Sequence, residues 1–349
     1  MLHVGTMKSG TTYLQTLLHA QKAELAEAGV LVPGGAPGAQ AAAVRSALVA
    51  AGNRTRWERL VGEIDAHRGV AVMSQEFLGP AADAAAQRVT DSFPGADIRV
   101  VVTARDLNRT LVSMWQETIQ NGRSWSWEEY LAGAREAAPG ATRGVRDKET
   151  PGGTFWRQQH LARMLADWSA RVGAENVTLV TVPPPGAEPA TLARRFAAAT
   201  GLPIQPAPVG HRANESLGLA SILVLRDLNA ALRALGIVGA EGRALRKRFI
   251  AKTALARLAA DEPRLGLEVP GWVRRQTDAT LASIRSLGVE VVGDLADLTP
   301  VDVAGVQPPD VSPEHRARAA LAALVETVAR HPDVRDVALE GRPAEAYGG

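Results

Sequence analysis

The chain has 349 residues, of which 46% are hydrophobic and 22% charged, the composition of an ordinary globular protein with one large or two smaller domains. A formal net charge of +2 is too small to indicate nucleic-acid binding. The absence of cysteine excludes disulfides, thiolate metal sites and a cysteine nucleophile, and fits the reducing cytoplasm, where we expect the protein to work. No apolar run approaches the roughly 18–20 residues that span a bilayer, and no signal-peptide pattern opens the chain.

The first fifteen residues have the pattern of a strand, a turn and the start of a helix. Residues 2–4 are apolar, small residues occupy 5–10, and leucines then recur at helical spacing. The free N–H groups and the dipole of a helix N-terminus attract anions. We therefore expect a phosphate site with close backbone approach at two glycines, one mobile charge and several hydroxyls, made by Gly5, Lys8, Ser9, Gly10, Thr11 and Thr12. The alternative is a small-residue turn that binds nothing.

Strand and helix patterns alternate through the first two hundred residues. Apolar strands are expected at 29–32, 69–74, 97–104, 177–182 and, later, 289–292. Helices are expected at 41–65 with a break near Gly52, from 106 to 121, after Ser126, at 154–172 with Thr154 as N-cap, and at 189–201, 214–235, 243–260, 274–287 and 313–330. This alternation predicts an α/β fold with a parallel sheet covered on both faces, whose ligands lie at the carboxyl ends of the strands.

The order of residues in the first turn departs from the usual phosphate-binding pattern, in which the lysine follows the second glycine. Here Lys8 precedes Gly10, in the order K-S-G-T-T followed by Tyr13. This loop resembles the 5′-phosphosulfate loop of sulfotransferases that use 3′-phosphoadenosine 5′-phosphosulfate (PAPS). The resemblance implies a P-loop-like three-layer core over residues 1–210 that binds PAPS. Residues 211–349 are then a mainly helical region, either part of the same domain or separate.

A second phosphate site is implied by the same resemblance. In the family, an arginine at a strand end and a serine eight residues later hold the 3′-phosphate, and Arg105 and Ser113 have that spacing. Asp106 is placed to cap the helix between them, so that Ser113 lies about two turns further along. The alternative for Arg105 is an ordinary charge at the start of a helix, and the alternative for Ser113 is a small residue that packs against its neighbours. The family's basic glycine-rich loop near the C-terminus has no good match here, and residues 210–216, with Arg212, are a weak candidate.

Sulfuryl transfer also needs a base for the acceptor and a positive charge at the leaving phosphate. Lys8 is the candidate for the charge. Glu76 follows an apolar strand and is the candidate base, whose pKa would rise if the side chain were buried beside Phe77 and Leu78. The alternative is a solvated carboxylate at a strand end. His3 and His160 are weaker candidates that fit structural histidines better, and no metal-ligand spacing is present, so we predict no catalytic metal.

The aromatic residues offer two nucleotide contacts. Tyr13 is expected to contact adenine, as the aromatic at its place does in the family. Trp125 and Trp127 would form a stacking wall for adenine or a sugar, although packing in the core or in a lid is the commoner role of such residues. The charged, glycine-bearing stretch 143–153 is a candidate lid.

These patterns together predict an enzyme that moves a sulfuryl group from PAPS to a hydroxyl or amine of a carbohydrate or small-molecule acceptor. They name no acceptor and no oligomeric state, and they predict no nucleic-acid partner. One alternative is an ATP-dependent kinase or NTPase, which would need the usual lysine placement and an acidic Mg²⁺ ligand. The other is a non-catalytic nucleotide-binding protein with a degenerate site.

Overall fold

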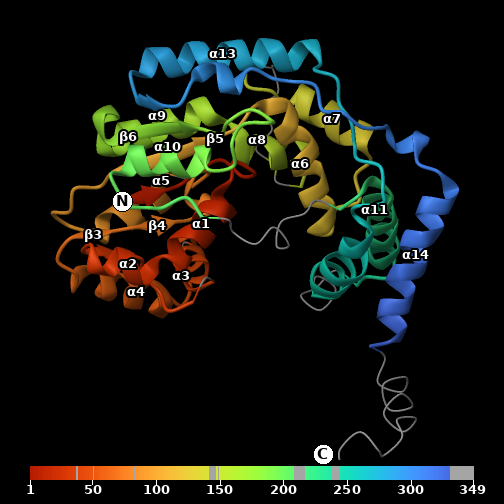
Figure 1. Cartoon of the computed structure of the whole chain (residues 1–349), viewed down its shortest axis with the longest axis horizontal. Helices are drawn as coiled ribbons and strands as arrows, with labels where there is room; N and C mark the ends of the chain where they lie inside the picture. Colours follow the sequence, from red (N-terminus) through yellow and green to blue (C-terminus); the bar gives the residue numbers. More distant parts are fainter. Residues whose placement is uncertain are drawn as a thin grey trace, which may run out of the picture. The chain divides into compact units, whose positions relative to one another are not determined.

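The computed structural model describes residues 1–36, 38–49, 51–81, 83–140, 147, 149–207, 217–237 and 244–330. The chain forms two compact units (Figure 1). The first is Met1–Leu111, Leu131–His211 and Val269–Val301, and the second is Val112–Tyr130, Arg212–Glu268 and Asp302–Gly349. Each unit draws on three separate stretches of the chain, so the division predicted at residue 210 stays a prediction.

The first unit is built on a parallel sheet of five strands, which confirms the predicted α/β class. Their order across the sheet is β4-β1-β5-β6-β7, and every neighbouring pair is parallel. The central strand β1 pairs with β4 and β5 on its two sides, with Leu2 opposite both Met73 and Val100. The strands are β4 (Met73–Ser74), β1 (Leu2–His3), β5 (Val100–Ala104), β6 (Val177–Thr181) and β7 (Glu290–Val292).

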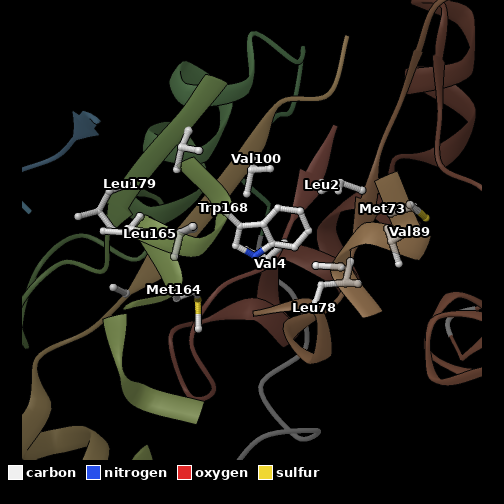
Figure 2. Packing of buried hydrophobic residues seen from close by; sticks show 14 of the residues in the cluster. Leu2, Val4, Met73, Leu78, Val89, Val100, Met164, Leu165, Trp168 and Leu179 are labelled. Carbon is white, nitrogen blue, oxygen red and sulfur yellow. The ribbon is translucent and has the colours of Figure 1, made fainter. Parts of the chain in front are cut away.

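One face of this sheet packs against a large hydrophobic cluster. Alternate residues of β5, Val100, Val102 and Ala104, point into it, as the two-residue period of a strand requires. Helices α9 (Leu161–Val172) and α13 (Gly271–Leu287) supply further hydrophobic side chains to this cluster. Figure 2 shows the indole of Trp168, from α9, at the centre of the cluster among strand residues.

The opposite face of the sheet packs against a second hydrophobic cluster, which contains the strand residues that alternate with those of the first. Val101 and Val180 pack there against the leucines of α1 (Thr11–Ala20) and Phe196 of α10 (Thr191–Thr200). Because β1 alternates in the same way, Leu2 faces the first cluster while the ring of His3 lies 4.9 Å from that of Phe196. Helices thus cover both faces, which gives the predicted three layers.

The predicted strand 69–74 is two strands with different partners. Val70–Ala71 forms β3, which pairs with β2 (Val30–Leu31) in a small separate sheet. The chain changes sheets at Val72, whose N–H donates to Leu31 O (2.8 Å), whereas the N–H of Met73 donates to Met1 O (3.0 Å). The remaining elements of the first unit are α2 (Lys22–Glu27), α3 (Ala39–Leu48), α4 (Thr55–Asp65), η1 (Glu76–Leu78), α5 (Asp83–Asp91), η2 (Ala174–Asn176) and η6 (Leu295–Leu298).

The predicted helix 154–172 is also two helices. α8 (Pro151–Gln159) begins three residues early, because the Thr150 hydroxyl accepts the N–H of Gly153 (3.2 Å) and acts as the N-cap in place of Thr154. The chain then breaks at His160, whose ring Nδ1 accepts the N–H of Arg163 (3.3 Å) and caps α9.

The second unit is helical over its described residues. Helices α6 (Leu107–Gln120) and α7 (Trp127–Glu136) each run from one unit into the other. Asn229 donates from its amide to Ile119 O (2.7 Å) and Arg123 O (2.8 Å), and so holds the end of α6. The other elements are α11 (Leu219–Ala234), a π-helical segment η4 (Ala244–Ala254) where an ordinary helix is predicted, η5 (Leu255–Leu258), η7 (Pro308–Asp310) and α14 (Pro313–Val328).

Candidate functional site

The loop between β1 and α1 has a backbone that few residues adopt. Gly5, Lys8 and Gly10 have φ values of +26°, +66° and +81°. A Cβ on Gly5 would lie 2.4 Å from the Thr103 hydroxyl, so the loop folds tightly against β5. Among the described residues, Lys8 is the one residue other than glycine with positive φ, a strained conformation that functional loops often hold. Left-handed residues interspersed in a loop turn successive N–H groups toward one concavity, which suits an anion.

A buried polar network supports this loop from below. His3 contacts the Ser74 hydroxyl through Nδ1 (2.7 Å) and the Thr103 hydroxyl through Nε2 (3.1 Å). The Thr103 hydroxyl also meets that of Ser9 (2.8 Å), which donates to Thr6 O (2.5 Å). The Ser9 side chain is therefore fully buried and bonded within the protein.

Complete burial lowers the pKa of His3 to about 3, so this ring is neutral in the folded protein and is a structural histidine. Between about pH 6.5 and 3 the unfolded chain binds a proton that the folded chain does not, so stability falls as the pH falls through this window. We expect that His3→Gln reduces the slope of unfolding free energy against pH by about 1.4 kcal/mol per unit between pH 6 and 4.

Urea unfolding at a series of pH values measures this slope, and the His3 ring resonance in NMR gives a check on the wild type. Equal slopes in the two proteins, or titration of the ring near pH 6, would contradict a neutral buried His3.

The helix that follows the loop begins at Thr11 with Gly10 as its N-cap, which supplies no side-chain hydrogen bond. Its first-turn N–H groups have no intrahelical partner and face the loop. Thr11 is buried, Thr12 is exposed and Tyr13 is half-buried, with a pKa raised by burial. The predicted strand, glycine-bearing turn and helix start are all present.

Glu76 begins a short 3₁₀ turn just beyond β4, next to the loop. A Cβ on Gly79, at the end of this turn, would lie 3.0 Å from the Gly5 carbonyl oxygen. The Gln15 amide, from α1, donates to Glu76 Oε2 (2.9 Å) and to Ser74 O (3.1 Å). Glu76 is half-buried and the Phe77 ring faces the Arg45 guanidinium (4.4 Å), so an amide hydrogen bond, rather than an apolar pocket, defines the position of this carboxylate.

Arg105 ends β5, the other neighbour of β1. Asp106 caps α6 by accepting the N–H of Arg109 (3.0 Å), as predicted, and its second oxygen pairs with the Arg109 guanidinium. The Nε of Arg105 lies 3.9 Å from that same second oxygen of Asp106. Among the described residues, the buried Nε of Arg105 has no hydrogen-bond partner. Burial is the main cause that lowers the pKa of Arg105, to about 10, and the nearby Arg109 adds to it, so Arg105 remains a cation at neutral pH.

A contrast with Arg195, which lies on α10 and reaches the end of the next strand, shows why Arg105 is notable. Arg195 contacts Asp297 at 2.6 Å and also donates to Thr181 O (2.9 Å) at the end of β6. Its charge is neutralised within the protein. Arg105 shares the Asp106 oxygen with Arg109 and lies 3.9 Å from it, so its charge is less closely neutralised than that of Arg195.

The structure brings together the loop, Glu76 and Arg105 at the carboxyl ends of three neighbouring strands, β4, β1 and β5. Ser113 lies two turns along α6, in the part of that helix that belongs to the second unit, so its pairing with Arg105 stays a prediction. Arg212 and residues 143–146 and 148 of the candidate lid lie outside the described residues.

Two weaker candidates have structural roles. His160 caps α9, and burial lowers its pKa. Trp127 is buried and packs between Trp115 and Tyr130, with ring centroids at 5.4 and 6.2 Å. Trp127 therefore packs in the core, which is the alternative to a stacking role. The guanidinium of Arg123 lies over the ring of Trp125, 4.9 Å from its centroid.

Two site residues carry no signal in the sequence. Gln15 holds Glu76, and the Gln159 amide of α8 donates to Met7 O (2.9 Å) and so braces the loop. Each contacts a residue far along the chain, and neither belongs to a motif, so their positions emerge only in three dimensions.

Over the described residues no helix is long and apolar enough to cross a membrane.

Comparisons with known proteins find little. No family model and no curated protein matches the chain. Among solved structures, a sulfotransferase from Alicyclobacillus acidocaldarius is similar with 17% identity and a TM-score of 0.42, over 69% of this chain and 97% of that one. Similarity at this level carries no inference about activity, so the case for a function comes from the residues of this chain.

Proposed function

We propose that this chain is a sulfotransferase that transfers a sulfuryl group from PAPS to a hydroxyl or amine of a carbohydrate or small-molecule acceptor. The observation that supports it best is the placement of two anion-binding elements on adjacent strands. The loop with Lys8 follows β1, and Arg105, a cation whose buried Nε makes no hydrogen bond among the described residues, directly follows β5. PAPS carries phosphate at both its 5′ and 3′ positions, so two such elements fit this molecule.

The 5′-phosphate would be held by the loop and the first turn of α1. The N–H groups of that turn, the exposed Thr12 hydroxyl and the Lys8 ammonium would be the donors to it. The resemblance assigns adenine contact to Tyr13 and the 3′-phosphate to Arg105 and Ser113. PAPS supplies the activated sulfuryl group, and Lys8 would stabilise negative charge on the bridging oxygen as it leaves.

Glu76 would accept the proton of the acceptor hydroxyl or amine. The Gln15 amide holds Oε2, which leaves Oε1 as the oxygen that we expect to take the proton. A carboxylate fixed by one hydrogen bond next to the loop is positioned for general base catalysis.

The test is formation of adenosine 3′,5′-bisphosphate (PAP) from PAPS in the presence of a panel of hydroxyl and amine acceptors. We expect PAP release that depends on one class of acceptor, with incorporation of labelled sulfate into it. ADP formation from ATP with no PAP release would contradict the proposal and favour a kinase.

A further inference from the structure

A pocket in the first unit opens beside the loop and Arg105. Thr6 and Arg105 line it from the strand ends, Gln159 from α8, and Thr277 and Thr280 from α13. All of these residues belong to the first unit. Apolar side chains, among them Trp156 and Leu281, make the rest of its wall. A pocket of this kind presents a few polar groups in a fixed, partly desolvated setting.

Two buried polar atoms in the wall of this pocket lack partners. The Arg105 Nε and the Thr277 hydroxyl are both buried without a hydrogen bond among the residues that the structure describes. Thr277 is 5% exposed. A threonine within a helix often donates to the carbonyl oxygen one turn earlier, and Thr280 does so, to Gln276 O (2.8 Å). A buried hydroxyl without a hydrogen bond is costly, so its retention in the wall of the same pocket as a guanidinium nitrogen that makes no hydrogen bond points to a ligand.

The chemistry of the two groups indicates what the ligand is. Both groups carry a proton that no acceptor takes among the described residues, and one belongs to a cation whose ion pair with Asp106 is 3.9 Å long. A phosphate ester presents several oxygens that accept hydrogen bonds and carries negative charge, so it can take both donors at once. A neutral ligand would add no negative charge beside Arg105, whose ion pair with Asp106 is long and shared with Arg109.

We propose that Thr277 of α13 completes, with Arg105, an oxyanion subsite that takes the 3′-phosphate of the nucleotide. This inference rests on the proposed function for the identity of the phosphate. It assigns to α13 part of the role that the basic glycine-rich loop has in the sulfotransferases that the sequence resembles. Thr277 is a binding residue for specificity between 3′-phosphorylated and other nucleotides.

The experiment compares Thr277→Val with Thr280→Val. Both substitutions keep the shape of the pocket wall, but the Thr280 hydroxyl proton is already donated to Gln276 O and is not available to an anion. Calorimetric titration with PAP and with adenosine 5′-phosphate (AMP) should show that Thr277→Val loses about 10-fold or more of its PAP affinity and keeps its AMP affinity. Thr280→Val should keep both affinities, and Thr277→Ser should retain the wild-type preference.

Two further readouts separate the possible failures. Inorganic phosphate should raise the melting temperature of wild type and Thr280→Val but not of Thr277→Val, which tests the subsite without a nucleotide. If no nucleotide binds to wild type while this phosphate effect persists, the proposed function is wrong and the oxyanion subsite stands. Equal behaviour of the two valine variants would overturn the inference. So would a lower melting temperature of Thr277→Val without ligand, because it would show a structural role for the hydroxyl.

Discussion

Replacement of Glu76 by glutamine should lower turnover by about 10²–10⁴-fold and leave PAP affinity almost unchanged. The amide has the size of the carboxylate, and its oxygen can still accept the Gln15 hydrogen bond now made at 2.9 Å. The position of the side chain is thus preserved while its ability to take a proton is lost. Steady-state kinetics with the acceptor found from the panel, together with calorimetry of PAP binding, measure the two effects separately.

The pH dependence gives this variant a second readout. A general base that must be ionised produces a rising limb in kcat as pH increases, and Glu76→Gln should remove that limb. Glu24→Gln, on α2, is the matched control, because Glu24 is an exposed carboxylate on a surface helix. Turnover equal to that of wild type would exclude Glu76 from the mechanism.

Removal of the Lys8 side chain should lower turnover by about 10²–10³-fold and also weaken PAP binding. The ammonium would stabilise charge that develops on the leaving phosphate, so its effect is expected to be larger in the transition state than in the bound complex. Lys8→Ala removes the charge and keeps a residue with a Cβ at φ +66°. Kinetics and calorimetry on this variant separate the effect on rate from that on binding.

Lys8→Gly is the companion variant. A left-handed conformation costs a residue with a Cβ roughly 1–2 kcal/mol, and glycine avoids most of that cost. We therefore expect Lys8→Gly to be at least as stable as Lys8→Ala in urea unfolding and equally slow in turnover. Recovery of activity in the glycine variant would show that the backbone of the loop, rather than the charge, carries the effect.

Local patterns in the sequence are sufficient to predict the strands and helices that carry the candidate site. The strand, glycine-bearing turn and helix from Leu2 onward follow from residue size and helical periodicity. Asp106 as the cap of α6 follows from its side-chain chemistry and its place after a strand. The parallel sheet follows from buried apolar runs such as β5, in which all five residues are buried.

Features that depend on tertiary pairing leave no local pattern in the sequence. The residues from Val70 to Met73 are all apolar, so nothing within them marks Val72 as the point where the chain changes sheets. The break at His160 depends on a side-chain cap that competes with continuation of the helix.

The residues that support the candidate site also depend on tertiary pairing, because their contacts lie in distant parts of the chain. Gln15, Gln159 and Thr277 are ordinary polar residues on helices, and their roles follow from what the sheet places beside them. Ser9 illustrates the converse. A serine in a phosphate-binding motif is expected to offer its hydroxyl to the ligand, but here the buried network with Thr103 and Thr6 takes it.

The most direct test of the central claim is calorimetric titration of the protein with PAP, ADP and ATP, repeated on Arg105→Ala. We expect a clear preference for PAP that the variant loses, because Arg105 would bind the phosphate that the other two nucleotides lack. Equal or tighter binding of ATP would contradict the assignment of Arg105 and favour a kinase, and no binding of any nucleotide would contradict the proposed use of PAPS.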